Sequence, residues 1–245
     1  KGRVVFLRPL GLRLGEKRGG FPSDSGGKMR TLIVSGGRIG RGFALSFLET
    51  ERFDRIIGVD NGLRFLYENG IMPTHVVGDF DTAAPELVDY YRSRDEIEIR
   101  TFNPVKDSTD TQIAIELALE LQSTEIVILG GTGSRIDHVL GNIQSLMLAK
   151  TAGVSCMILD ENNRIRLIDG ETVLTKEEQY GNYVSLIPLT TEVTGVDLIG
   201  FKYPLSSHTF TSTGSGSLGV SNELLEDVGR IRMKSGVFVM VEARD

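Results

Sequence analysis

The sequence predicts an α/β domain with a mostly parallel sheet, followed by an all-β, sandwich-like domain. Two observations carry this prediction. In the first part, short apolar runs rich in β-branched residues alternate with segments of helical periodicity, which is the pattern of crossover units in a parallel sheet. After about residue 162 the helical periodicity stops, and only short strand-like runs separated by turn residues follow.

The expected elements of the first part come in a regular order. The runs typical of buried strands are Thr31–Ser35, Arg55–Val59, His75–Gly78, Glu96–Arg100, Glu125–Leu129 and Ser155–Leu159. Amphipathic helices are expected between them. The clearest two carry apolar residues at helical spacing, at Ile113, Ala114, Leu117, Ala118 and Leu121, and at Ile136, Val139, Leu140, Ile143 and Met147.

The second part is expected to contain strands alone. The runs that predict them are Arg164–Ile168, Thr172–Thr175, Tyr183–Ile187, Val193–Ile199, Arg230–Met233 and Val237–Val241. The dipeptides Asp169-Gly170 and Ser235-Gly236 predict tight hairpins. We therefore divide the chain into a basic leader over residues 1–28, an α/β domain over 29–160 and an all-β domain over 163–245.

Composition narrows the class of protein. Hydrophobic residues make up 40% of the chain, which is enough for a substantial core. The net charge of -6 argues against a nucleic-acid-binding protein, and no apolar stretch is long enough to cross a bilayer. The single cysteine, Cys156, cannot form an internal disulfide, which favours a reducing compartment such as the cytoplasm. Its apolar neighbours predict that it is a buried packing residue.

Residues 1–28 differ from the rest of the chain. They carry seven basic and two acidic residues, a net charge of +5. We expect a flexible leader ahead of Met29, with a transit peptide as the alternative.

Carboxylates stand close to the carboxyl ends of the expected strands, where parallel sheets bind ligands. They are Asp60, Asp79, Asp81, Asp107, Asp110 and Asp137. Asp79 and Asp81 are two residues apart, so in an extended segment their side chains point the same way. Converging carboxylates repel each other unless a cation holds them, and oxygen ligands select hard ions. The sequence therefore predicts a Mg²⁺ site at this edge of the sheet.

A glycine loop, Gly130–Ser134, precedes one of the expected helices. Glycines allow backbone N–H groups to approach a phosphate at the positive end of the helix dipole. Arg135 and Lys106 can add fixed positive charge. Taken singly, such features also have structural explanations, since Asp107 and Asp110 could be an N-cap and a first-turn acid, and Asp137 could serve the helix dipole. Their coincidence at one sheet edge favours a nucleotide-phosphate site.

A second glycine-rich segment, Gly36–Gly42, follows the first expected strand. With Asp60 about 20 residues later it partly resembles a dinucleotide-binding fingerprint. No starting position gives G-x-G-x-x-G with Asp60 at the right distance, and no G-x-x-x-x-G-K-[ST] motif is present. A nicotinamide-dependent oxidoreductase is therefore the weaker interpretation.

In this order, the motifs resemble those of the thiamine pyrophosphokinase (thiamine diphosphokinase) family. The corresponding segments are Asp60–Gly62, Gly78–Thr82, Lys106–Thr111, Gly130–His138 continuing to Asn142-Ile143, Gly200–Leu205 and Gly219–Glu223. The resemblance extends from Thr31 to the C-terminus and covers both expected domains. Six ordered motifs are far more specific than any one of them.

The resemblance implies transfer of the β,γ-pyrophosphoryl unit of ATP to thiamine, giving thiamine diphosphate and AMP. It also implies a homodimer with active sites between the subunits. Carried over to this chain, the Mg²⁺ ligands would be Asp79, Asp81 and Asp110, with Asp60, Asp107 and Asp137 close by as further catalytic candidates. The ATP-binding residues would be Lys106, Gly131, Thr132, Gly133, Arg135 and Asn142, and the thiamine-binding residues Tyr203, Ser221 and Asn222.

The chain departs from the family pattern at three points. Ser134 replaces a usual glycine, and Gln112 stands where bacterial members often carry Glu. The chain has no Trp, which some relatives stack on thiamine, so Tyr203 or another residue is expected to take that role. Two other function classes stay open: transfer to a different small alcohol, and a non-catalytic sensor of nucleotide or thiamine diphosphate.

Overall fold

The computed structural model describes residues 27–78, 85–101, 108–214 and 217–245. Four of the predicted site residues lie outside these ranges, and so does most of the basic leader. These four residues are Asp79, Asp81, Lys106 and Asp107.

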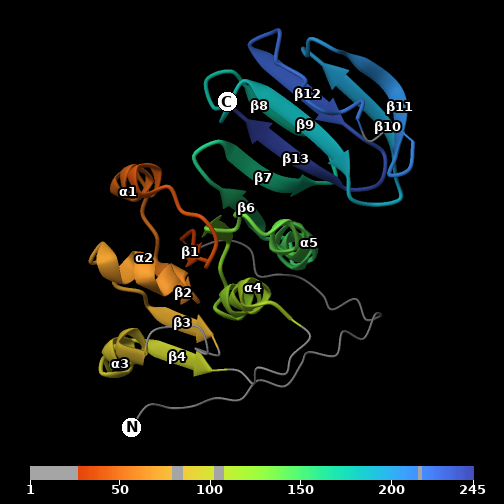
Figure 1. Ribbon diagram of the computed structural model, residues 1–245. Helices are drawn as coiled ribbons and strands as arrows, with labels where there is room; N and C mark the ends of the chain where they lie inside the picture. Colours follow the sequence, from red (N-terminus) through yellow and green to blue (C-terminus); the bar gives the residue numbers. More distant parts are fainter. Residues whose placement is uncertain (1–26, 79–84, 102–107, 215–216) are drawn as a thin grey trace.

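The first part of the chain forms a parallel sheet (Figure 1). Its strands are β1 (Arg30–Val34), β2 (Arg55–Val59), β3 (His75–Gly78), β4 (Glu98–Thr101), β5 (Glu125–Leu129) and β6 (Ser155–Leu159). They pair in the order β4-β3-β2-β1-β5-β6, and every pair in this series is parallel. The prediction of a mostly parallel sheet is confirmed. The one larger shift is in β4, which begins two residues after its predicted start.

Helices cover both faces of this sheet (Figure 1). They are α1 (Arg41–Thr50), α2 (Gly62–Glu68), α3 (Pro85–Arg92), α4 (Asp110–Glu120) and α5 (Ile136–Thr151). On one face Ile33 and Ile128 pack with Leu117 of α4 and Leu146 of α5. On the other, Leu32 packs with side chains of α1 and α2. β-Branched residues fill the sheet because both of its faces are buried.

The sheet continues without a break into the second part of the chain. β6 pairs with β7 (Asn163–Ile168) in antiparallel register, and β13 (Phe238–Ala243) and β9 (Tyr183–Pro188) follow at the edge. A second antiparallel sheet has the order β11-β10-β12-β8, formed by β8 (Thr172–Thr175), β10 (Glu192–Ile199), β11 (Leu205–Thr211) and β12 (Val228–Arg232). Phe210 and Phe238 meet edge to face in the core that the two sheets share. This confirms the sandwich-like second part.

Three details of the second part differ from the prediction. The prediction of two tight hairpins was wrong. Asp169-Gly170 joins β7 to β8, and Ser235-Gly236 joins β12 to β13, but in each case the two strands lie in different sheets and do not pair. Strand β11 was not predicted, since its sequence LSSHTFT is largely polar. The division at residues 160–163 stays a prediction, and the sheet runs straight across it.

Two apolar features noted in the sequence differ in how far they are buried. Cys156 is buried, as predicted for a packing residue, and its burial raises the pKa of its thiol, so it is not a reactive thiolate. The apolar stripe of α5, in contrast, is partly solvent-exposed: Ile136 is 65% exposed, Leu140 57% and Met147 37%. Among the described residues, no helix is long and apolar enough to span a membrane.

Candidate active site

The loops after β1 and β5 meet where the strand order of the parallel sheet reverses direction. β1 and β5 are neighbours in the sheet although three strands separate them along the chain. Such a switch point opens a crevice for ligands at the carboxyl ends of the strands. The Ser35 N–H donates to the Leu129 carbonyl at 2.8 Å, and the Gly37 N–H donates to the Gly130 carbonyl at 2.9 Å.

The glycine loop after β5 is held in place through its backbone carbonyl groups, which accept hydrogen bonds from other segments. The carbonyls of Gly130 and Thr132 accept from the N–H groups of Gly37 and Arg38, the latter at 2.7 Å. The carbonyl of Gly131 accepts from the buried Asn142 side chain at 2.9 Å. Three successive carbonyl oxygens, which would repel a phosphate, are thus engaged by protein donors. This leaves the loop suited to present N–H groups to an anion.

Gly37 explains why the segment after β1 is rich in glycine. A Cβ on Gly37 would lie 2.1 Å from the Thr132 carbonyl oxygen, so any side chain would push the two loops apart. The Gly36-Gly37 pair therefore supports the glycine loop through close backbone packing. This function differs from that of the dinucleotide fingerprint which the pair partly resembles.

Arg135 and Asp137 form an exposed ion pair at the start of α5. The Nη2 atom of Arg135 lies 2.5 Å from Oδ2 of Asp137, and their side chains are 69% and 65% exposed. The hydrogen bond from Arg135 lowers the pKa of Asp137, and the same contact raises the pKa of Arg135. Both groups are charged at neutral pH. The pair places a guanidinium at the positive end of a helix dipole, where an anionic ligand would gain from both.

Asp60 lies directly beside the end of β1. Its backbone has a φ of 47°, in the left-handed region that non-glycine residues seldom adopt. A Cβ on Gly36 would lie 3.2 Å from the Cβ of Asp60, and a Cβ on Gly62 would lie 2.1 Å from the Val34 carbonyl oxygen. The Asp60–Gly62 motif is therefore pressed against the end of β1, with Asp60 beside the segment that follows this strand.

Asp110 reaches the same place from α4. Thr109 caps this helix by accepting from the Gln112 N–H at 3.2 Å, and Asp110 is the first helical residue. The hydroxyls of Ser35 and Thr111 are 2.6 Å apart and tie the first turn of α4 to the end of β1. Thr109 thus caps the helix, and Asp110 lies in its first turn, where an acidic side chain also favours the helix dipole.

The predicted metal site falls largely outside the described residues, since two of its three expected ligands, Asp79 and Asp81, lie there. Among the residues that the structure does describe, no group of three or more His, Cys, Asp and Glu side chains comes together. The candidate ligands are carboxylates alone, a donor set that suits Mg²⁺. Strand β3 ends at Gly78 and pairs with β2, the strand that precedes Asp60.

A cleft of about 330 Å³ opens beside the glycine loop. Its lining includes Thr132 and Gly133 of the loop, Arg38, and the turn between β6 and β7. Asp160 begins this turn, and its carboxylate accepts a hydrogen bond from the Thr132 hydroxyl at 2.7 Å. The sequence analysis did not single out Asp160. It follows the predicted strand Ser155–Leu159, so the rule that selected Asp60 could have found it.

The expected thiamine-binding residues lie together at the far edge of the sheet. The Asn222 amide accepts from the Tyr203 N–H at 3.0 Å and donates to the Tyr203 carbonyl at 2.9 Å. Asn222 is buried and fixes the backbone of Tyr203, whose side chain is 61% exposed. Ser221 has a φ of 58° and donates its N–H to the Ser185 hydroxyl. A direct contact of any of the three with thiamine stays a prediction.

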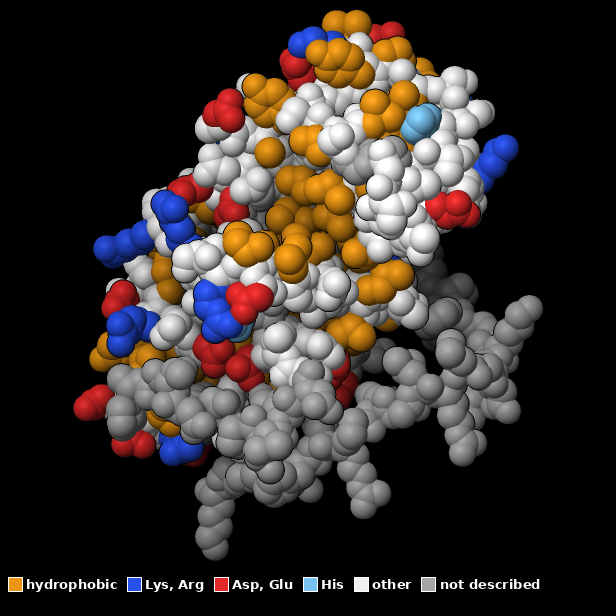
Figure 2. All heavy atoms as spheres, turned by 45° about the vertical axis from the view of Figure 1, so that its right-hand side comes forward, with side chains coloured by type: hydrophobic (Ala, Val, Ile, Leu, Met, Phe, Trp, Pro, Cys, Tyr) orange, Lys and Arg blue, Asp and Glu red, His pale blue; other side chains and the backbone are white. Residues whose placement is uncertain are grey.

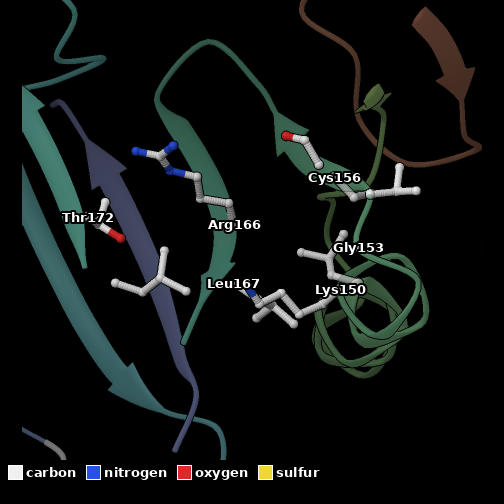
Figure 3. A pocket seen from close by; sticks show the side chains of 10 residues that line it. Lys150, Gly153, Cys156, Arg166, Leu167 and Thr172 are labelled. Atoms are coloured by element: carbon white, nitrogen blue, oxygen red, sulfur yellow. The ribbon is translucent and has the colours of Figure 1, made fainter. Parts of the chain in front are cut away.

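A second cavity, of about 270 Å³, is not part of this site. Its lining comes from the end of α5, the start of β6, and β7 and β8 (Figure 3). Gly153 and Cys156 place it at the opposite end of β6 from Asp160. Of its two cations, Lys150 pairs with Asp169 at 2.5 Å, whereas Arg166 lies 3.6 Å from Glu242, a carboxylate that it shares with Arg164.

Comparison with known proteins identifies the family. Residues 48–158 match the model of the thiamin pyrophosphokinase catalytic domain, and residues 171–238 match the model of its vitamin B1 binding domain. The chain belongs to the thiamine pyrophosphokinase family. The thiamine pyrophosphokinase of Bacillus subtilis is 36% identical over 193 residues, which cover 77% of this chain and 87% of that protein.

Solved structures agree with this assignment. The crystal structure of thiamine pyrophosphokinase from Bacillus subtilis superposes with a TM-score of 0.76 at 31% identity, covering 88% of this chain and 99% of that one. The structure of the protein from Geobacillus thermodenitrificans gives a TM-score of 0.75 at 31% identity, over 89% and 98% of the two chains. The matches to this family extend over both parts of the chain.

Proposed function

We propose that this chain transfers a pyrophosphoryl group from ATP to thiamine, giving thiamine diphosphate and AMP. The observation that carries the proposal is the glycine loop at the switch point, whose three carbonyls are engaged by Gly37, Arg38 and Asn142. Such a loop at the start of α5 suits the phosphates of a nucleotide. It belongs to a chain in which catalytic and vitamin B1 binding domain models both match, in that order.

The chain's own residues would act mainly through position and charge. The N–H groups of the glycine loop and the guanidinium of Arg135 would bind the triphosphate and orient it for in-line attack by the thiamine hydroxyl. Lys106 would add positive charge from the segment before α4. One aspartate of the edge would take the proton from the hydroxyl. This division of labour follows from phosphoryl-type transfer, which depends on positioning and electrostatic stabilisation.

We further propose that Asp79, Asp81 and Asp110 hold Mg²⁺, with Asp60, Asp107 and Asp137 nearby. The all-carboxylate donor set supports this assignment, and so does the contact of Thr111, next to Asp110, with Ser35 at the end of β1. When bound, Mg²⁺ would neutralise charge on the phosphate oxygens. Placement of the protein in the cytoplasm stays a prediction that rests on its single cysteine.

A homodimer with shared active sites is the third part of the proposal. Asn222 is hydrogen-bonded to Val184 of β9, four strands away from β5 in the sheet. At about 4.8 Å per strand this separates the two halves of the site by roughly 19 Å, more than a molecule of thiamine's size spans. A second chain could bring them together. The exposed stripe of α5 supports this, and Figure 2 shows hydrophobic side chains gathered at the middle of one face.

Light scattering of the purified chain should therefore give about twice the mass of 26.9 kDa. Leu140→Glu places a charge in the exposed stripe and should shift the mass to that of one chain, with loss of turnover. Met72→Glu, a comparable change at a 39% exposed residue outside α5, is the matched control and should leave the mass unchanged. Full activity from a single chain would contradict shared sites.

Phosphorus NMR of the protein with Mg-ATP, with and without thiamine, tests the reaction itself. Thiamine-dependent formation of thiamine diphosphate and AMP, with no ADP, is the expected result. Formation of ADP would mean that a single phosphoryl group is transferred. ATP turnover with other small alcohols in place of thiamine would identify a different acceptor. Binding without any turnover would favour a sensor.

A further inference from the structure

Thr132 is the one residue of the glycine loop whose side chain is hydrogen-bonded to a distant strand end. Its hydroxyl donates to Oδ2 of Asp160 at 2.7 Å, while its carbonyl accepts from the Arg38 N–H at 2.7 Å. A threonine hydroxyl has a single proton to donate. Because that proton is committed to Asp160, the hydroxyl has none left for a phosphate oxygen. Thr132 therefore acts as an anchor of the loop.

The Asp160 carboxylate is itself fixed by the turn that it begins. Its Oδ1 atom accepts from the N–H groups of Asn162 and Asn163, at 2.9 and 2.7 Å, and from the Asn163 side chain at 3.0 Å. These bonds set the direction of the carboxylate and aim Oδ2 at Thr132. A charged acceptor makes the bond to the hydroxyl stronger than one between neutral groups.

The turn after β6 is also hydrogen-bonded to residues later in the chain. The Tyr180 hydroxyl donates to the Asp160 carbonyl, and the Asn162 side chain donates to the Arg244 carbonyl at 3.1 Å. Arg244 donates back to the Glu161 carbonyl at 2.8 Å, and its guanidinium lies 4.6 Å from the centre of the Tyr180 ring. These contacts hold the turn that begins at Asp160 on the side away from the glycine loop.

We propose that Asp160 is a positioning residue for the nucleotide-binding loop. Through the Thr132 hydroxyl it holds the loop in the conformation that receives the phosphates, and it does not itself touch the nucleotide. A carboxylate would repel the phosphates if it faced them, and its engagement by Thr132 and the turn keeps its oxygens occupied. This inference rests on the proposed function and adds a residue to its nucleotide site.

Steady-state kinetics of four variants test the inference. Thr132→Val and Asp160→Ala should each raise the KM for ATP roughly tenfold, the effect of losing one hydrogen bond to a charged group. The KM for thiamine and the kcat should change little. The double variant should show the same tenfold increase as either single one, because both changes remove the same bond. Thr132→Ser keeps the hydroxyl and should restore the parent value.

Thr31→Val is the matched control. Its hydroxyl makes a buried hydrogen bond of the same length, 2.7 Å, to Ser123, but Thr31 lies at the opposite end of β1 from the glycine loop. The control should lose stability through its own buried hydrogen bond and keep the parent KM for ATP. An increase of that KM in Thr132→Val without one in Asp160→Ala would identify Thr132 as a direct phosphate ligand and overturn the proposal.

Hydrogen exchange in the nucleotide-free protein separates this inference from the proposed reaction. Amides of residues 131–135 should exchange faster in Thr132→Val and Asp160→Ala than in the parent or in Thr31→Val. This measurement needs no turnover, so it stays informative if the chain acts on another acceptor. It also shows whether Asp160→Ala unfolds more than the loop. Unchanged exchange of these amides in Thr132→Val would overturn the positioning role.

Discussion

Asp79→Asn and Asp81→Asn variants should each form thiamine diphosphate at least about a hundredfold more slowly than the parent. The two side chains follow β3, which ends beside β2 and Asp60 at the carboxyl edge of the sheet. An amide has one oxygen and no negative charge, so it is a poorer ligand for Mg²⁺ than a carboxylate. Initial rates measured across a range of Mg²⁺ concentrations would give the size of the loss and any increase in the Mg²⁺ requirement.

Asp89→Asn provides the control for this pair. It makes the same chemical change at an exposed residue of α3, a few residues further along the chain. Its rate should match the parent, and all three variants should unfold at nearly the same urea concentration. Near-normal rates in both Asp79→Asn and Asp81→Asn would contradict the metal assignment.

Glu242→Ala should lower the free energy of unfolding by about 3–5 kcal/mol. The Glu242 side chain is fully buried, and its carboxylate accepts from Arg164 through Nε at 2.8 Å and Nη2 at 2.5 Å. It also accepts from the Tyr180 N–H at 3.3 Å. Removing the carboxylate leaves the largely buried guanidinium of Arg164 without its counter-charge. Urea denaturation followed by circular dichroism would measure the change.

A Glu→Ala change in an exposed ion pair is the comparison for Glu242→Ala, because it removes a carboxylate that is not buried. Glu171 pairs with Arg232 at 3.0 Å, and both side chains are about half exposed. Arg232 lowers the pKa of Glu171 through this hydrogen bond. Glu171→Ala should nevertheless change stability by less than about 1 kcal/mol, because solvent screens the pair. An equally small effect of Glu242→Ala would show that burial does not strengthen the Arg164 pair.

Local sequence patterns were enough to predict most of the parallel sheet. Strands β2, β3, β5 and β6 have the predicted bounds. Each is a run of apolar and β-branched residues that is buried on both faces, so the signal lies in consecutive residues. The motifs at the strand ends were also readable, because a glycine loop before a helix and a carboxylate after a strand are local features. Together they predict a nucleotide site at the carboxyl edge of the sheet.

Patterns were less informative where one face of an element is not covered within the chain. Strand β11 was missed because several of its side chains are exposed and polar. In α5 the apolar stripe predicted the helix correctly but did not show which residues are buried. Asn142, Ser145, Leu146 and Ala149 face the core, whereas Ile136 and Leu140 are exposed. Periodicity locates an apolar face without saying what covers it.

The sequence by itself determined the type and place of the main elements, the family motifs and the chemistry of the candidate site. Only the tertiary structure decided how distant segments pair. It joined β6 to β7 across the expected domain boundary, placed β7 and β8 in different sheets, and brought Asp160 to Thr132. Helices and strands can be predicted because burial and backbone preference are reflected in the types of consecutive residues. A contact between residues far apart in the chain depends on the packing of everything between them, and no single segment records it.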